Sequence, residues 1–175
     1  ASDVYKRQIE GLSLETQKAI SGCPSVVRLA VESGRVKRFS GYRLDLIRGR
    51  WTTLPDGRPA IYDEERIEIK LTYRRWVKGS GRREGRICYT TEVFSLLLRL
   101  SGEVIEIELN GERCHPGVDG EWHRIELIPP KPGYLGIEND LQEATVVIRG
   151  RGGVYLLSLL LISRDGAYVL TEANR

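Results

Sequence analysis

The sequence predicts an antiparallel β-sandwich with a short N-terminal helix, and three observations support this fold class. Residues 67–74, IEIKLTYR, alternate between apolar and polar side chains, which is the period of a strand with one buried face. At least seven segments of strand type are separated by turn residues, and no long helical pattern lies between them. This order favours hairpin-linked strands over the strand–helix–strand units of a parallel sheet.

The length and composition indicate one globular domain. With 175 residues the chain can bury a sizeable core, and its 41% hydrophobic and 29% charged residues are typical of folded proteins. The net charge of +3 is small, so composition alone does not require a polyanionic partner. The longest apolar run, residues 154–162, is too short to cross a bilayer as a helix, and no membrane partner is expected.

The N-terminal residues indicate how the chain is divided. Residues 1–8, ASDVYKRQ, resemble the translation of a sequencing-library adapter of the kind that contaminates metagenomic assemblies, and the chain contains no Met. We therefore expect a gene fragment of a longer protein and exclude these residues from the fold. Residues 9–50 are interpreted as the remnant of a preceding domain, a linker or extra strands, and residues 51–175 as the β-sandwich domain.

One helix is predicted near the N-terminus, over residues 13–21, SLETQKAIS. Ser13 is suited to the N-cap, Glu15 favours the positive end of the helix, and the GCP that follows ends it. Strands are expected in the rest of the chain, with a turn-rich loop over residues 53–60. The expected strands are residues 25–33, 35–47, 67–74, 94–100, 105–109, 125–127, 144–150, 153–163 and 167–172.

Residues 94–100 and 154–162 are apolar on both faces, which is unusual for a sandwich strand with one wet face. Either they are central strands under a covering loop, or they form part of a contact with another domain.

The stretch ELNGERCHPGVDGEWHRIEL, residues 108–127, combines turn signals with chemically active side chains. Asn110 and Gly111 predict a type I′ turn, because both positions of that turn need a positive φ. Residues 111–121 are then expected to form a loop before Trp122 resumes a strand.

Zinc-binding atoms occur in this stretch on Cys114, His115, Asp119 and His123. Their spacing matches no closed zinc site, so no metal site is predicted. His123 shares strand parity with Ile125 and Leu127, and we interpret it as a core or boundary residue. Three cysteines without paired spacing also predict no disulfide framework, which leaves the cellular compartment undecided.

Trp122 has the opposite parity to His123 and shares it with Arg124. An exposed Trp could stack on the apolar face of a sugar ring while Arg124 bonds its hydroxyls. The alternative is that Trp122 packs under its own loop, since Trp is mostly buried.

The order of motifs in the second half resembles a known family. An LRL strand is followed by a strand ending in LNG, by GEW opening another strand, and by PGYLGIEND before a closing apolar strand. Over residues 60–162 this order resembles the galactose-binding-like, jelly-roll β-sandwich domains appended to bacterial glycoside hydrolases. The resemblance implies a non-catalytic accessory module that binds carbohydrate or packs on a preceding catalytic domain.

Within that module, the candidate carbohydrate-binding residues are Trp122, Arg124 and Tyr134. Such sandwiches often hold a structural calcium, and Asp63, Glu64 and Glu65 in YDEER are possible donors, the alternative being a solvated turn. No other cofactor is expected.

Two other classes of function, an enzyme and a nucleic-acid-binding protein, have their own sequence signals. The chain has no GxSxG, HExxH or phosphate-binding loop, and no carboxylate pair stands out, so the fragment itself is not expected to be an enzyme. Residues 74–86, RRWVKGSGRREGR, hold six basic residues against one Glu, with Trp76 among them. The alternative function is therefore a nucleic-acid-binding or virion-type jelly roll, unless this segment is only a solvated hairpin tip.

Overall fold

The computed structural model describes residues 9–21, 26–32, 35–36, 42–74, 78–83, 86–90, 94–127, 141–163 and 166–172; the adapter-like residues 1–8 and Tyr134 lie outside the described residues. Among the described residues, no helix has the length and apolarity that a membrane span needs. In chain order the elements are α2 (Leu14–Ser21), β1 (Val26–Glu32), β2 (Arg35–Val36), β3 (Tyr42–Arg48), β4 (Arg50–Thr53), β5 (Pro59–Asp63), β6 (Arg66–Arg74), β7 (Lys78–Arg83), β8 (Arg86–Thr90), β9 (Phe94–Leu109), β10 (Glu112–Cys114), β11 (Gly117–Asp119), β12 (Trp122–Leu127), β13 (Leu141–Ser163) and β14 (Gly166–Glu172).

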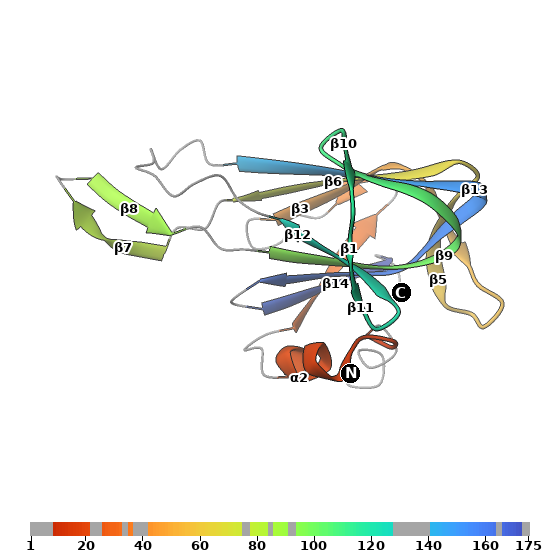
Figure 1. Cartoon of the computed structure of the whole chain (residues 1–175), viewed down its shortest axis with the longest axis horizontal. Helices are drawn as coiled ribbons and strands as arrows, with labels where there is room; N and C mark the ends of the chain where they lie inside the picture. The colour runs from red at the N-terminus through yellow and green to blue at the C-terminus, as the bar shows by residue number, and fades with distance from the viewer. Residues whose placement is uncertain are drawn as a thin grey trace.

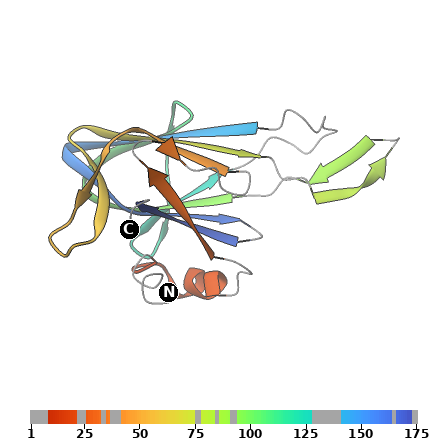
Figure 2. The ribbon, with the colours of Figure 1, turned by 180° about the vertical axis from the view of Figure 1, so that it is seen from behind.

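Two long strands, β9 and β13, belong to both layers of the molecule. They pair with each other in antiparallel register, with shifts where both strands turn back. The first half of β13 also pairs with β6, and its second half pairs with β5 and then with β14. One twelve-stranded sheet therefore folds over itself into a sandwich, as the curved blue and green ribbons show (Figures 1 and 2).

The sequence predicts separate strands at residues 144–150 and 153–163, and this division is wrong. β13 is continuous, and the GRGG between these segments is where it bends. Gly153 has a φ of 112°, and a Cβ there would lie 2.8 Å from the hydroxyl oxygen of Tyr62. Glycine permits both the backbone conformation and the close approach of Tyr62, so residues that look like strand breakers bend a strand instead.

The space between the layers is filled by the inward side chains of both. Ile67, Ile69 and Leu71 of β6, which the alternating pattern predicts to face the core, are at most 3% exposed. Leu96 and Leu98 of β9 enter the same cluster from the opposite layer. The predicted β-sandwich is therefore confirmed, with its polar residues on the outer faces.

The first layer contains β3, β6 and β10 with the adjoining residues 104–109 of β9 and 141–149 of β13, and the second contains β12 and β14 with the other ends of β9 and β13. A second, smaller apolar cluster lies on the outer face of the second layer. It is covered by residues 9–21, which include α2, drawn in red in Figure 1. β9 and β13 are thus buried on both faces over their apolar segments, around residues 96–98 and 159–161. The covering interpretation of these segments is confirmed, except that the cover includes a helix and is not a loop alone. The cluster consists of Ile9, Leu12, Ile20, Leu97, Trp122 and Leu160, with Ile162 packed against it.

Polar contacts hold this N-terminal cover in place. The Oγ of Ser13 accepts the Thr16 N–H at 3.2 Å, so the predicted N-cap is confirmed. The Ser13 N–H donates to Asp119 Oδ1 at 3.0 Å, and the Thr16 hydroxyl donates to Asp119 Oδ2. The Glu121 N–H donates to the Gly11 carbonyl at 2.7 Å. The cover is therefore fastened to the turn between β11 and β12.

Residues 108–127 form two tight hairpins. Asn110 and Gly111 have φ values of 52° and 81°, so the predicted type I′ turn between β9 and β10 is confirmed. The loop predicted over residues 111–121 is wrong, because most of it belongs to β10 and β11. Strands of three residues are too short to show an alternating pattern.

Two pairs of strands do not follow the main pattern of the twelve-stranded sheet. β1 pairs in parallel with β14, which is possible because no hairpin links two strands so far apart in the chain. β7 and β8 form a separate two-stranded sheet at the far left of Figure 1, and they carry most of the basic segment 74–86. Trp76 lies outside the described residues.

We expect Leu97→Ala to lower the free energy of unfolding by about 2–5 kcal/mol, because it opens a cavity between the sheet and its N-terminal cover. Leu14→Ala is the control, since Leu14 lies on the same cover but is 74% exposed, and it should change stability by less than about 0.5 kcal/mol. Urea unfolding measures both. Equal effects would show that residues 9–21 do not cover Leu97.

We expect Gly120→Ala to loosen the N-terminal cover. Gly120 has a φ of 60°, and a Cβ there would lie 2.0 Å from the Gly11 carbonyl oxygen. Gly111→Ala is the matched control, because its φ is 81° but its Cβ would meet nothing within 4 Å. Gly111→Ala should cost about 1–2 kcal/mol of backbone strain alone. Gly120→Ala should cost about 1–3 kcal/mol more and should speed tryptic cleavage after Lys18; equal cleavage rates in the two variants would contradict this.

Candidate functional site

Trp122 does not form part of an exposed site, which corrects the expectation that it stacks on a sugar. Its side chain lies on the outer face, as its parity predicts, but it is 1% exposed under the N-terminal cover. Its indole N–H donates to the Glu10 carbonyl at 2.7 Å. The alternative that Trp122 packs under its own loop is right that Trp122 is buried but wrong about the cover, which comes from residues 9–21.

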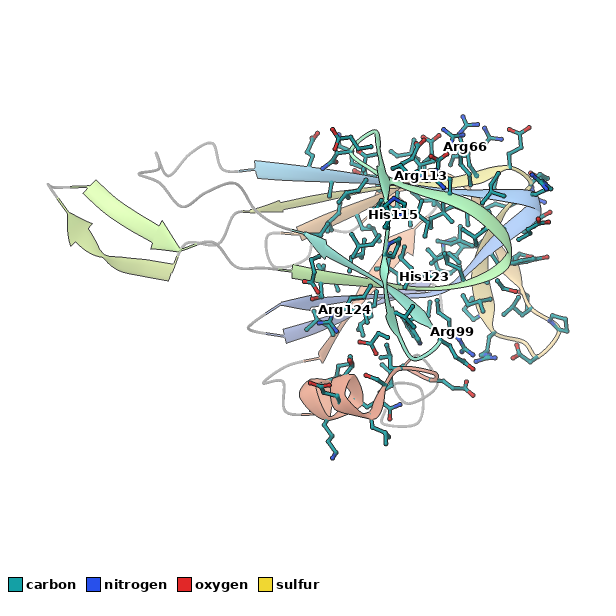
Figure 3. All side chains as sticks on the ribbon, viewed as in Figure 1. Arg66, Arg99, Arg113, His115, His123 and Arg124 are labelled. Atoms are coloured by element: carbon teal, nitrogen blue, oxygen red, sulfur yellow. The ribbon has the colours of Figure 1, made fainter. Side chains whose placement is uncertain are left out.

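Arg124 is engaged in a network of three partners on this same side. Its Nη1 lies 2.9 Å from Asp119 Oδ2, its Nε lies 2.8 Å from Glu126 Oε1, and its Nη2 donates to Ser95 Oγ at 3.0 Å. Figure 3 shows Arg124 on the side of the sandwich that carries α2. Three of its five N–H groups are engaged by these partners, and the side chain is 35% exposed. The structure thus gives Arg124 a role in fastening the fold.

Asp119 is the buried centre of this network. Burial by itself would raise the pKa of Asp119, but hydrogen bonds from Thr16, Ser13 and Arg124 outweigh it and hold the pKa below its ordinary value. The carboxylate is therefore charged at neutral pH and accepts bonds from both the cover and the sheet. It connects residues 9–21 to β12.

The possible zinc ligands do not converge. Asp119 is the cross-strand partner of Trp122 and so lies on the outer face, whereas His123 has the opposite parity. Cys114 packs against the core, where burial raises the pKa of its thiol. In the part of the chain that the structure describes, no group of three or more His, Cys, Asp or Glu is arranged to hold a metal ion.

Asp63, considered above as a calcium ligand, closes the turn between β5 and β6. Its Oδ2 accepts the N–H groups of Glu65 and Arg66, both at 2.9 Å, and lies 3.3 Å from Arg48 Nε. Burial would raise the pKa of Asp63, but these two backbone donors and the guanidinium hold it below its ordinary value. Asp63, Glu64 and Glu65 are all among the described residues, and the structure does not group them as a metal site.

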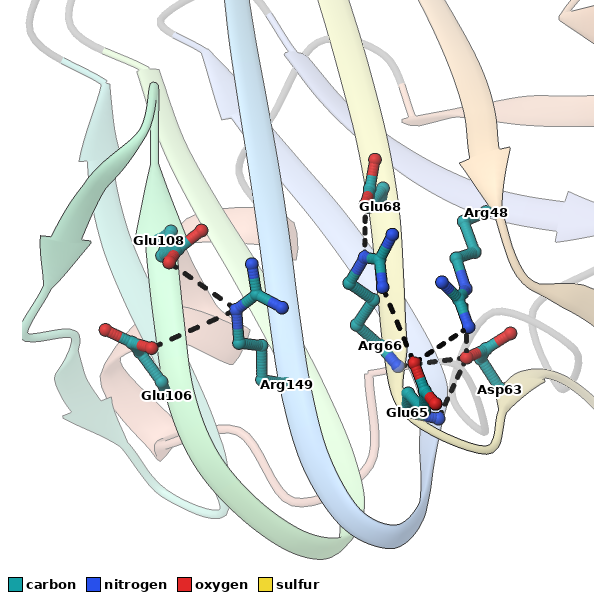
Figure 4. Close-up of polar contacts among 8 residues, drawn as sticks. All are labelled: Arg48, Asp63, Glu65, Arg66, Glu68, Glu106, Glu108 and Arg149. Atoms are coloured by element: carbon teal, nitrogen blue, oxygen red, sulfur yellow. Dashed lines mark hydrogen bonds and ion pairs between the residues drawn. The ribbon is translucent and has the colours of Figure 1, made fainter.

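The outer face of the first layer carries a ladder of paired charges (Figure 4). Arg149 of β13 lies between Glu106 and Glu108 of β9, with Nε at 3.9 and 3.5 Å from their carboxylate oxygens. On the neighbouring strand Arg66 pairs with Glu68 in the same way. Each carboxylate here has a cation beside it, so this face is a solvated surface without a strong net field.

A row of partly exposed side chains crosses the outer face at the bend of the sandwich. Arg50 of β4 is the cross-strand partner of Tyr62 on β5, Tyr62 is the partner of Tyr155 on β13, and Tyr155 is the partner of Ser101 on β9. Their neighbours Ile61 and Val154 face the core, so the row faces outward. We call Arg50, Tyr62, Tyr155 and Ser101 the tyrosine row.

The tyrosine row combines aromatic surface with hydrogen-bonding groups. The rings of Tyr62 and Tyr155 are 4.6 Å apart at their centroids and tilted by 40°. The Arg50 guanidinium carbon lies 5.1 Å from the centre of the Tyr62 ring, and its Nη1 lies 2.9 Å from Glu64 Oε1. This is the arrangement of an apolar platform with donors and an acceptor at its edge.

Sequence reasoning missed these residues because each Tyr stands alone in the chain, in AIYDE and GVYLL. A parity signal was present, since Tyr62 follows the apolar Ile61 and Tyr155 follows the apolar Val154. Only the register between β5 and β13 brings the two rings together. Tyr134, the third predicted residue, lies outside the described residues.

The comparisons with known proteins find similarity at the level of structure. No protein-family model and no curated protein matches the chain. Among solved structures, the chain is similar to TmCBM61 in complex with beta-1,4-galactotriose, at 14% sequence identity, over 71% of this chain and 90% of that chain, with a TM-score of 0.33. A similarity of this degree assigns neither a ligand nor a site to the present chain.

We expect Asp119→Asn to destabilise the fold by roughly 2 kcal/mol at neutral pH, because charged hydrogen bonds between sheet and cover are weakened. The folded pKa of Asp119 lies below its ordinary value of 3.8, so its stabilisation is complete above that value and is lost as the pH falls through the folded pKa. The difference between wild type and variant should therefore shrink between about pH 5 and about pH 2. Urea unfolding across this range measures it, with the exposed Glu112→Gln as control; a difference independent of pH would contradict the assignment.

Proposed function

We propose that this chain is a non-catalytic accessory module of a carbohydrate-active enzyme and that it binds carbohydrate at the tyrosine row. The observation that carries the proposal is the outward-facing pair of rings, Tyr62 and Tyr155, with Arg50 and Ser101 at either end of the same cross-strand row. A galactose-binding-like relationship and a glycoside hydrolase as the parent protein belong to this proposal.

The chemistry of sugars supports this surface. The C–H faces of a pyranose ring are apolar, so they pack on an aromatic ring, while the hydroxyls around the ring need polar partners. Tyr62 and Tyr155 offer both, because each phenol has an apolar body and a hydroxyl that can donate and accept. Both side chains are partly exposed, so a ligand can reach them from solvent.

The surface also suits a binding role better than a catalytic one. A glycosidase needs two carboxyl groups at a set separation across the sugar, one of them able to donate a proton at its working pH. Glu64 is the acid beside the row, and the pKa of Glu64 is held below its ordinary value by its own backbone N–H and by Arg50. Such a group stays ionised, which suits it to accept hydrogen bonds and not to act as a general acid.

We expect the wild-type chain to be retarded in native gels that contain a neutral soluble polysaccharide, namely β-1,4-galactan, galactomannan or mixed-linkage β-glucan. Tyr155→Ala should weaken the retardation about five- to twelvefold, because an aromatic contact contributes of order 1–1.5 kcal/mol. Tyr155→Phe should keep most of the stacking and lose only the hydroxyl. Trp122→Phe should leave binding unchanged, because Trp122 is buried.

Thermal melting of each variant separates loss of the site from loss of the fold. The proposal requires that Tyr155→Ala keep the wild-type transition while losing affinity. If no polysaccharide retards the wild-type chain, carbohydrate binding is excluded for this panel and packing on a catalytic domain remains. Salt-sensitive retention on single-stranded DNA that disappears in an Arg82→Ala, Arg83→Ala double variant would instead favour the nucleic-acid alternative.

A further inference from the structure

The Arg50–Glu64 ion pair stands out from the other charged pairs because Arg50 belongs to the tyrosine row. Its Nη1 and Oε1 atoms are 2.9 Å apart, and the two side chains are 63% and 57% exposed. Arg50 is also stacked over Tyr62. The pair therefore presents a donor and an acceptor side by side, at the edge of an aromatic surface and open to solvent.

The geometry of Arg50 leaves donors for a ligand. A guanidinium carries five N–H groups in a planar fork, and the contact with Glu64 engages one nitrogen. In the part of the chain that the structure describes, Glu64 is the one ion-pair partner of Arg50. Stacking on Tyr62 fixes the plane of the fork, so less conformational freedom is lost when a ligand binds.

A neutral diol matches this pair, and a charged sugar does not. Each hydroxyl both donates and accepts, so two neighbouring hydroxyls can donate to Glu64 and accept from Arg50 while the ion pair stays intact. A sugar carboxylate can bond Arg50 only by approaching the negative charge of Glu64 or by displacing it. Like-charge repulsion of this kind is a common means of rejecting a related ligand.

We propose that the Arg50–Glu64 pair is the selectivity element of the tyrosine row, binding adjacent hydroxyl groups of a neutral sugar and rejecting sugars that carry a carboxylate. This inference rests on the proposed function, and it names the ligand class as neutral hydroxylated glycans. Tyr62 and Tyr155 supply affinity for the ring, and Glu64 supplies the discrimination.

The test compares each neutral polysaccharide of the panel with the same polysaccharide after its primary hydroxyls have been oxidised to carboxylates. The wild-type chain should bind the neutral form at least about tenfold more tightly, which corresponds to about 1.4 kcal/mol. Glu64→Gln keeps the size and an acceptor oxygen but removes the charge. It should bind the neutral form within about threefold of wild type and lose most of the discrimination.

Glu143→Gln is the matched control. Glu143 is exposed to nearly the same degree, at 58%. Its ion pair with Lys70, at 3.1 Å, joins β13 to β6 in the first layer, away from the tyrosine row. This variant should keep both the affinity and the discrimination of wild type. Because exposed ion pairs contribute little to stability, both variants should melt as wild type does.

The outcomes separate the two proposals. Equal binding of neutral and oxidised forms by the wild-type chain would overturn the selectivity role and leave the proposed function standing. Discrimination that survives in Glu64→Gln would also overturn it, because the charge of Glu64 would then not be its source. Failure of the wild-type chain to bind either form of any polysaccharide would overturn both proposals together.

Discussion

The architecture depends on one constraint, the continuous antiparallel pairing of β9 and β13 around a bend. Each strand contributes inward side chains to both layers, so the core between the layers is built largely on a single folded ribbon. A bend in a paired ribbon needs both strands to turn at the same place, and Gly102 of β9 is the cross-strand partner of Val154, next to Gly153. The glycines and the register shifts therefore occur at the same place in both strands, and together they let the sheet fold over itself.

The tyrosine row is a consequence of that bend. β5 joins β13 directly after the bend, and there Tyr62 lies over Gly153 and beside Tyr155. A larger residue at Gly153 would push Tyr62 away from its partner. The two rings are thus placed by strands rather than by a loop, which favours a surface of fixed geometry.

The N-terminal cover buries an apolar outer face of the sheet that lies outside the main core. Strands β9 and β13 carry Leu97 and Leu160 on the face that would otherwise meet water, and residues 9–21 bury both. Burial of apolar surface supplies the stabilisation, while the Asp119 contacts to Ser13 and Thr16 determine where the cover sits. Trp122 is a buried contact of this cover.

Local patterns in the sequence determined the elements whose signals are short in range. The alternation that begins at Ile67, the Ser13 cap and the Asn110–Gly111 turn each depend on neighbours within a few positions. The cap and the turn are present in the structure, and so is the alternation as far as Leu71, where the described burial ends. Tertiary structure decided the rest. Trp122 is buried because residues about a hundred positions earlier lie over it, and Tyr62 meets Tyr155 only through the register of β5 on β13. Parity assigns a side chain to a face of a strand, but whether that face is covered, and by what, depends on packing between distant segments that a local pattern does not encode.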